Sequence, residues 1–324
     1  PQYAIVAAES LLGVALHQGT SFPVGKVDFL DLYPLNFREF LCAMGEKQFV
    51  SMLDSCDTQM VTVFKTKYIE RLREYYFVGG MPEVVKDFSE KKDYNRVRAI
   101  QKNLINYYQQ DFSKHAEIKL VPRLNLVWNS IPMQLAKENK KYIYGQVREG
   151  SRAKDFELAI QWLLDCGLIH KVQRIQKPDL PLKAYIDFDA FKLFLVDIGL
   201  LIAMTDLDAK VIIEGNKIFT EFKGSLTEQY ILQQLISDVG VIPYYYSTQN
   251  SKGEIDFLVQ GKTSVIPIEV KAEENLKAKS LKAFCEKYQP SYAVRTSMSD
   301  YREQDWMTNI PLYAVKWIKN YVNQ

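Results

Sequence analysis

The sequence predicts a mixed α/β protein made of several domains, and three observations lead to this prediction. A length of 324 residues is enough for two or three domains. Apolar residues recur at helical spacing through residues 35–125, whereas helices alternate with short strand-like runs farther along the chain. Hydrophobic residues make up 47% of the chain and charged residues 25%, which provides for buried cores and argues against long disorder.

The beginning of the chain has an apolar strand pattern, "YAIVAA" over residues 3–8, followed by a short helix or turn that Gly19 closes. The chain opens with Pro1 rather than Met, so we expect a preceding segment. The stretch "GTSFPVGKV" invites comparison with a phosphate-binding loop. Five residues separate its glycines where that loop has four, and Val27 stands where it needs Ser or Thr. We therefore reject a nucleotide site in this stretch.

Residues 35–119 are predicted to form a helical subdomain. A strand over residues 25–34 should lead into a helix that starts near Leu35. Gly79 and Gly80 should then end one helix, and Pro82 should stand in the first turn of the next. A hinge at the two glycines is the alternative. The apolar spacing over residues 93–114 predicts a further long helix.

Residues 120–206 have the layout of a winged helix. Helices are expected around "RLNLVWNSIPMQLAKEN", "YGQVREGS" and "AKDFELAIQWLLDC", with Gly167 ending the third. The strand-like runs "LIHKVQRI" and "KAYIDF" then form a ribbon. A winged helix can place its third helix in a DNA groove, and Arg152 and Lys154 would make contacts there. The alternative is a rigid spacer or a protein contact, which the acidic Asp155 and Glu157 favour.

The charge distribution does not distinguish a nucleic-acid-binding protein from one with an ordinary solvated surface. The net charge is only +2, but residues 100–180 hold 13 Lys and Arg against 8 Asp and Glu. This excess suits phosphate contacts and equally suits a solvated surface. The apolar stretch at residues 191–204 is too short to span a bilayer and reads as a buried helix or strand pair. Lys192 and Asp197 are predicted to form an internal polar pair within it.

Residues 207–324 predict the order α-β-β-β-α-β. A helix covers "FKGSLTEQYILQQLISDVG", and the strands are "IPYYYSTQ", "GEIDFLVQG" and "SVIPIEVKA". "AKSLKAFCEKYQ" is a helix and "SYAVRTS" a strand. Tyr244, Tyr245 and Tyr246 could stack on nucleic-acid bases, but in a strand they more often fill a core.

Acidic and basic side chains within these strands form the candidate site. Glu269 and Lys271 lie two residues apart in a strand, so both project from the same face. If the strands around Asp256 and Glu269 pair as a hairpin, the two carboxylates approach each other, and each raises the pKa of the other. A divalent cation, Mg²⁺ or Mn²⁺, relieves that repulsion. Glu228 on the preceding helix would supply a third carboxylate, and Lys271 would stabilise charge on a phosphate.

Asp256, Glu228 and the Glu269-x-Lys271 pair resemble the PD-(D/E)xK nuclease superfamily, close in style to archaeal Holliday-junction resolvases. The resemblance implies a restriction-endonuclease-like fold with Asp256, Glu269 and Lys271 as catalytic residues. It implies metal binding by Asp256, Glu269 and Glu228. Lys279 and Lys282 on the next helix would face a DNA backbone. The first motif here reads Glu-Ile-Asp, without the proline of the superfamily pattern.

A wider resemblance covers nearly the whole chain. The series "SLLGVAL", "LYPLNFREFL", "YYFVGGMPEVV", "AIQWLLDCGLIHKV", "LPLKAYIDFDAFKLFLVDIGLL" and "GEIDFLV…IPIEVKA" is similar to prokaryotic AAA-type ATPases that carry a C-terminal domain of unknown function. This resemblance implies that residues 1–34 are the last part of an ATPase core, with Glu9 and Ser10 at a sensor-like position. ATP would bind only to an N-terminal domain that precedes this chain.

The remaining expectations concern location and activity. The four cysteines form no CxxC and the three histidines are dispersed, so we expect reduced thiols in a cytoplasmic protein without a zinc site. We predict a DNA-associated part of an ATPase with a Mg²⁺-dependent nuclease domain. The alternative is a non-catalytic module that binds nucleic acid or protein and is moved by ATP hydrolysis upstream. A purely structural remnant is the third reading.

Overall fold

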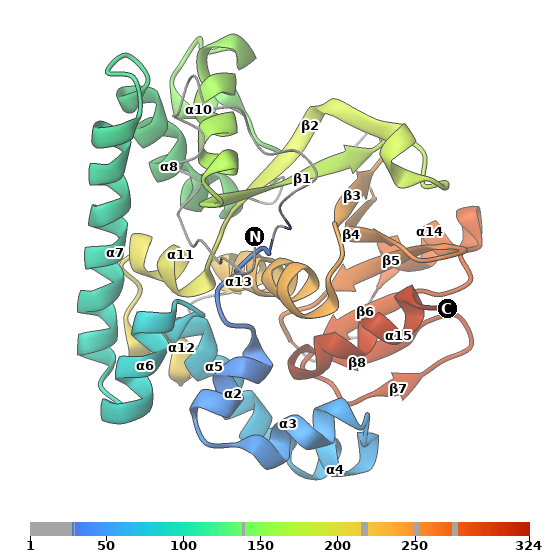
Figure 1. The fold of residues 1–324 in the computed structure, drawn as a ribbon. Helices are drawn as coiled ribbons and strands as arrows, with labels where there is room; N and C mark the ends of the chain where they lie inside the picture. The colour runs from blue at the N-terminus through green and yellow to red at the C-terminus, as the bar shows by residue number, and fades with distance from the viewer. Residues whose placement is uncertain (1–27, 29, 138–139, 215–219, 249–252, 274–277) are drawn as a thin grey trace, which may run out of the picture.

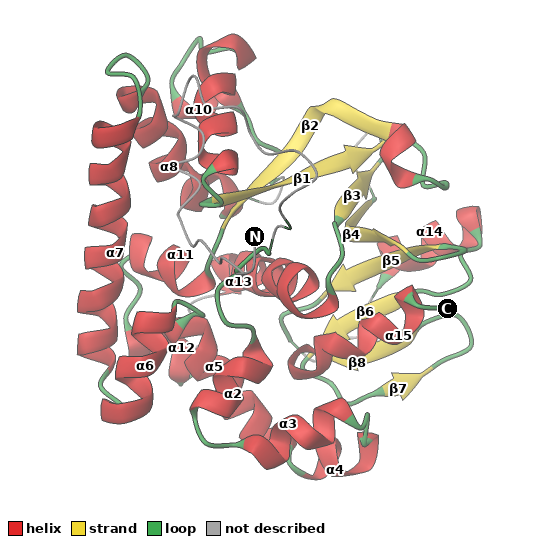
Figure 2. Cartoon of the chain, in the orientation of Figure 1, coloured by secondary structure: helices red, strands yellow, loops and turns green. Residues whose placement is uncertain are grey.

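Helices and one mixed sheet make up the computed structural model of the chain, which describes residues 28, 30–137, 140–214, 220–248, 253–273 and 278–324 (Figures 1 and 2). This confirms the predicted mixed α/β class. The rejected phosphate loop, Glu9 and Ser10 lie outside the described residues. In the part of the chain that is described, no helix is both long enough and apolar enough to cross a membrane.

The N-terminal part is helical, as predicted. Its helices are α2 (Phe37–Ala43), α3 (Lys47–Asp54), α4 (Thr58–Val63), α5 (Lys65–Val78), α6 (Pro82–Lys91) and α7 (Tyr94–His115). α2 begins at Phe37 because Asn36 accepts a hydrogen bond from the Glu39 amide while the Glu39 carboxylate accepts one from the Asn36 amide. The strand expected before it is wrong over the described residues 28 and 30–34, where Leu30 and Leu32 are exposed rather than packed in a sheet.

The Gly79-Gly80 corner ends α5 as predicted. Gly79 has φ +76°, a conformation that favours glycine. A Cβ on Gly79 would lie 2.3 Å from Asp197 Oδ1, and one on Gly80 would lie 2.2 Å from the Leu35 carbonyl oxygen. The Gly80 amide donates to Asp197 Oδ2 at 2.6 Å. The corner is therefore fixed by close contacts with the Asp197 side chain and the Leu35 backbone, as well as by the end of the helix.

The winged-helix elements form in the predicted order. They are α8 (Val121–Leu135), α9 (Tyr144–Val147), α10 (Ala153–Asp165), β1 (Ile169–Ile175) and β2 (Ile186–Leu195), with a 3-10 turn, η1 (Leu182–Tyr185), between the strands. Gly167 follows α10 at φ +66°, in the predicted terminating role. β1 and β2 pair antiparallel from Ile169↔Leu195 to Ile175↔Ile186.

The predicted pairing of Lys192 with Asp197 is wrong. The apolar stretch divides into the end of β2 and a helix, α11 (Ile198–Met204), which α12 (Ala209–Ile213) follows. Asp197 is the N-cap of α11 and accepts from the Leu200 amide at 3.0 Å. Lys192, on β2, contacts Glu254 instead, with 2.5 Å between Nζ and Oε1. The cap explains the difference, because an Asp before an apolar helix satisfies free amides of its first turn.

The last part of the chain confirms the predicted α-β-β-β-α-β order. Its elements are α13 (Thr220–Gln234), the π-helix η3 (Leu235–Val239), β3 (Tyr244–Ser247), β4 (Glu254–Gln260), β5 (Val265–Val270), α14 (Lys279–Tyr288) and β6 (Val294–Ser297). Beyond them come β7 (Arg302–Glu303), β8 (Thr308–Pro311), the 3-10 turn η4 (Leu312–Trp317) and α15 (Ile318–Val322). The sequence did not indicate the π-helix.

The wing of the winged helix is part of the main sheet. Among the described residues, eight strands form one sheet in the order β2-β1-β3-β4-β5-β6-β8-β7. β1 runs parallel to β3 through Arg174↔Tyr245 and Ile175↔Tyr246. Tyr244, Tyr245 and Tyr246 are buried, which confirms the core interpretation of these residues. The ribbon therefore continues the sheet of the last domain and does not project freely.

One hydrophobic core connects the helical part to the sheet, from Phe37 to Ile318. Figure 1 shows α13 in the middle, between the α5 and α11 helices and the strands. The Trp317 indole donates to the Leu53 carbonyl at 2.7 Å, and the rings of Tyr68 and Tyr313 stack 5.0 Å apart. In this structure, the helical subdomain packs directly against the C-terminal elements.

Candidate functional site

The predicted hairpin brings Asp256 and Glu269 to neighbouring strands. β4 and β5 pair antiparallel with the register Phe257↔Ile268 and Leu258↔Pro267. Continuing that register by one residue places Asp256 opposite Glu269. Asp256 Oδ2 accepts a hydrogen bond from the Val270 amide at 2.7 Å. We call Glu228, Asp256 and Glu269 the acidic cluster.

Lys271 pairs with Glu269, its predicted neighbour on the same face of the strand. The distance from Lys271 Nζ to Glu269 Oε1 is 2.6 Å, and the Glu269 side chain is only 6% exposed. Glu269 Oε2 has no hydrogen-bond partner among the described residues. One oxygen of this buried carboxylate is thus held by an amine, and the other is left without a donor.

Glu228, on α13, lies between two lysines that are far from it in the sequence. Lys140, in the segment between α8 and α9, forms an ion pair with Glu228 Oε1. Lys192 Nζ lies 3.7 Å from Glu228 Oε2 and also contacts Glu254 on β4. The side chain of Lys192 is 0% exposed. The acidic cluster therefore receives ammonium groups from the winged-helix part of the chain.

The pKa values reflect this crowding of charges. Burial raises the pKa of Asp256 well above its ordinary value, and the charges of Glu228 and Glu269 raise it further. Burial also raises the pKa of Glu269, although Lys271 opposes this effect. Burial opposes ionisation of Glu228, but Lys140 and Lys192 outweigh it and lower its pKa. Three carboxyl groups are thus close enough to influence one another electrostatically.

The acidic cluster does not fit a metal ion in this arrangement. Its oxygens are hard donors of the type that Mg²⁺ prefers. Glu228 is held by two lysines, Glu269 by one, and Asp256 by a backbone amide. Within the described ranges, no group of three or more His, Cys, Asp or Glu side chains is placed to hold a metal ion. The residues of the predicted metal set are close together, but ammonium groups take up their charges.

The four predicted nucleic-acid contacts lie on two separate helices. Arg152 precedes α10 and Lys154 lies in its first turn, and both are exposed. Lys279 and Lys282 are exposed on α14, one helical turn apart. Figure 1 shows α10 and α14 on well-separated parts of the molecule. The two pairs thus belong to different surfaces.

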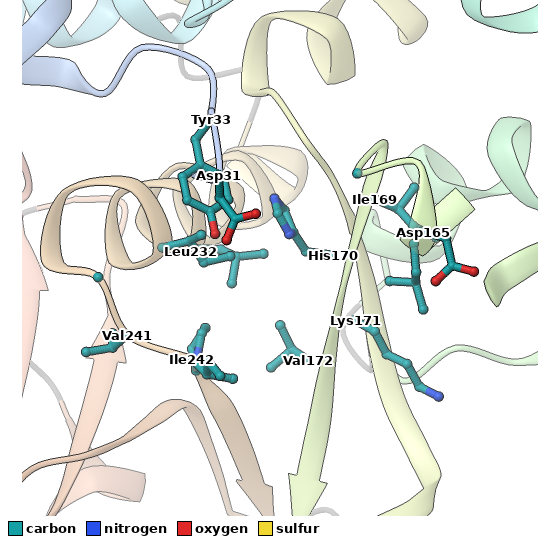
Figure 3. Close-up of a pocket in the computed structure, with 15 residues that line it drawn as sticks. Asp31, Tyr33, Asp165, Ile169, His170, Lys171, Val172, Leu232, Val241 and Ile242 are labelled. Carbon is teal, nitrogen blue, oxygen red and sulfur yellow. The ribbon is translucent and has the colours of Figure 1, made fainter. Parts of the chain in front are cut away.

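A pocket of about 510 Å³ opens between the wing and α13, away from the predicted site residues (Figure 3). Its apolar lining includes Val172, Leu232 and Ile242. Figure 3 shows His170 pointing into the pocket toward Asp31, whereas Lys171 points away. Burial lowers the pKa of His170 to about 4. No local sequence pattern marks this pocket, because its walls come from segments far apart in the chain.

His170 should make the protein less stable in mild acid. The unfolded chain takes up a proton at the ordinary pKa of 6.5, whereas the folded chain does so near 4. Stability is therefore complete above pH 6.5 and falls toward pH 4, by up to about 3 kcal/mol. Urea unfolding between pH 7 and pH 4 should show a smaller loss for His170→Asn. His115→Asn, at the end of α7, is the control. If it made the loss of stability between pH 7 and pH 4 smaller by the same amount, this assignment would be contradicted.

Comparison with known proteins finds two domain families. Residues 69–211 match a domain of unknown function, DUF8612, and residues 223–315 match another, DUF4143. The second family is commonly found in AAA-ATPase-associated proteins. No curated protein and no solved structure matches this chain. The first match ends within α12 and the second begins within α13, so the winged-helix elements fall in the first and the acidic cluster in the second.

Proposed function

We propose that this chain is a nucleic-acid-binding module of an AAA-type ATPase, and that the module does not cut DNA in the arrangement seen here. The match of residues 223–315 to a domain family found in AAA-ATPase-associated proteins supports the link to an ATPase. Nucleic-acid binding is proposed from the exposed basic pairs at α10 and α14. The observation that carries the second half is the neutralisation of the acidic cluster. Lys140, Lys192 and Lys271 provide the positive charges that a nuclease would obtain from a metal ion.

The winged helix and the last domain would act as one body in this proposal. β1 pairs with β3 in a single sheet, and Lys192 on β2 reaches Glu254 on β4. A displacement imposed by ATP hydrolysis upstream would therefore move α10 and the acidic cluster together. Such coupling suits a module that positions bound nucleic acid.

Charge reversal tests which surface binds DNA. We expect Arg152→Glu combined with Lys154→Glu to weaken binding of duplex DNA by about tenfold or more, because each lost phosphate contact reduces the release of counterions. Lys279→Glu combined with Lys282→Glu is the matched pair on α14. Fluorescence anisotropy over a series of salt concentrations measures both affinity and salt dependence. Absence of binding by the wild type at low salt would rule out the nucleic-acid proposal and leave a protein partner.

A metal-dependent phosphodiesterase is the second candidate, favoured by the position of Asp256 opposite Glu269 with Lys271 beside it. The assay is nicking of supercoiled plasmid in Mg²⁺ or Mn²⁺. We expect the wild type to leave the plasmid intact. Nicking by the wild type that both Lys271→Met and Asp256→Asn abolish would replace the non-cutting proposal with this candidate.

A further inference from the structure

The pocket between the wing and α13 has one wall made by β1, and the alternation of that strand decides which side chains face it. His170 and Val172 lie on the pocket side, whereas Lys171 turns to the opposite face (Figure 3). There the Lys171 ammonium lies 4.3 Å from the centre of the Phe191 ring. The lysine that borders the pocket therefore directs its charge away from it.

The facing wall is apolar and comes from the end of α13 and from η3. Leu232, Ile236 and Val241 line it. η3 ends at Gly240, whose amide donates to the Leu235 carbonyl at 3.0 Å and whose φ of +80° favours glycine. A π-helical turn often marks a functional site, and here this turn forms part of the pocket wall.

His170 is a polar side chain without a protein partner in this apolar setting. Its ring is largely enclosed by protein, and within the described ranges no group exchanges a hydrogen bond with it. An imidazole kept neutral by burial has one nitrogen that accepts a hydrogen bond, and Asp31, toward which His170 points, is an acceptor as well. A ligand that displaces water from the pocket must therefore offer a donor, because a polar group left unsatisfied in an apolar site costs free energy.

We propose that this pocket binds a neutral, largely apolar small molecule that carries one hydrogen-bond donor, an N–H or O–H group, directed at His170. The volume of about 510 Å³ lies within the usual range of small-molecule sites, roughly 300–1,000 Å³. Asp31 and Asp165 are exposed lining residues whose carboxylates disfavour an anion, and the apolar interior disfavours a desolvated cation. The inference goes beyond the proposed function and does not depend on nucleic-acid binding.

Indole and 1-methylindole are the matched probes for this pocket, because they differ only in the N–H hydrogen that the methyl group replaces. Titration of the whole chain by calorimetry should show that one indole binds per chain. 1-Methylindole should bind about fivefold or more weakly, since it cannot donate a hydrogen bond to His170. Equal affinities for the two probes, or no saturable binding of indole to the wild type, would overturn the inference.

His170→Phe separates the hydrogen bond from the extra bulk of the methyl group. Phenylalanine keeps a ring in the wall but has no ring nitrogen, so this variant should bind the two probes with equal affinity. Lys171→Met, on the opposite face of β1, is the control and should keep the wild-type preference for indole. A preference that survives in His170→Phe would contradict the assignment of the hydrogen bond to His170.

A third variant, Ile242→Trp, shows whether the probe binds in this pocket. Ile242 lines the pocket and is 61% exposed, so a larger side chain there should narrow the pocket without disturbing the core. We expect Ile242→Trp to weaken indole binding about tenfold or more while the melting temperature stays unchanged. Indole binding as tight as that of the wild type would place the probe elsewhere and overturn the inference. DNA binding is measured separately by anisotropy, so a failure of the proposed function remains distinguishable.

Discussion

Asp197→Ala should lower the free energy of unfolding by about 3–5 kcal/mol, because it leaves several buried donors without an acceptor. The Asp197 carboxylate accepts hydrogen bonds from the Gly80 amide at 2.6 Å, the Leu200 amide at 3.0 Å and the Gln233 side chain at 3.2 Å. These donors come from the α5–α6 corner, α11 and α13. Asp197 is completely buried, so water cannot replace it. Urea unfolding monitored by circular dichroism measures the loss.

Asp208→Ala is the control for the helix-capping part of this effect. Asp208 caps α12 and accepts from the Lys210 amide at 2.8 Å, but it is exposed. Its replacement should cost about 1 kcal/mol, the usual value of an N-cap. Equal losses in the two variants would mean that Asp197 acts as a cap alone and does not join three elements.

The hairpin of the candidate site could be predicted because its information is local. Alternation of apolar residues fixes which side chains share a face of a strand, and two strands separated by a short turn pair as neighbours. Asp256 and Glu269 are therefore placed opposite each other by residues 254–270 alone. The helices of the N-terminal part were predictable for the same reason, since apolar residues that recur every three or four positions are a local signal.

The lysines around Glu228 could not be predicted, because they reach it through the tertiary fold. Lys140 and Glu228 lie 88 residues apart, and Lys192 and Glu254 lie 62 apart. The approach of Lys192 to β4 depends on the parallel pairing of β1 with β3, which no local pattern specifies. Asp197 is different. An Asp followed by an apolar helical run is an N-cap signal, and this signal argues for a cap at Asp197 and against the predicted pair with Lys192.

Lys192→Met should destabilise the protein by about 3–5 kcal/mol, the usual cost of removing one partner from a buried ion pair. Burial opposes the charged form of Lys192, but Glu228, Glu254 and Asp256 outweigh it and raise its pKa. The ammonium also lies 4.8 Å from the centre of the Tyr245 ring. Methionine has a similar length but no charge, so the loss measured in urea unfolding reports the uncompensated carboxylates rather than a cavity.

A second substitution shows whether electrostatics is the cause. Glu254→Gln in the Lys192→Met background removes one of the negative charges left without the Lys192 ammonium and should recover part of the lost stability, which a packing defect would not allow. Lys177→Met is the surface control, because Lys177 and Asp179 form an exposed pair that solvent screens, and its loss should change stability little. If Lys192→Met alone behaved like Lys177→Met, Lys192 would not carry the link between the wing and the acidic cluster. The joint movement of the two parts would then depend on the strand pairing of β1 with β3.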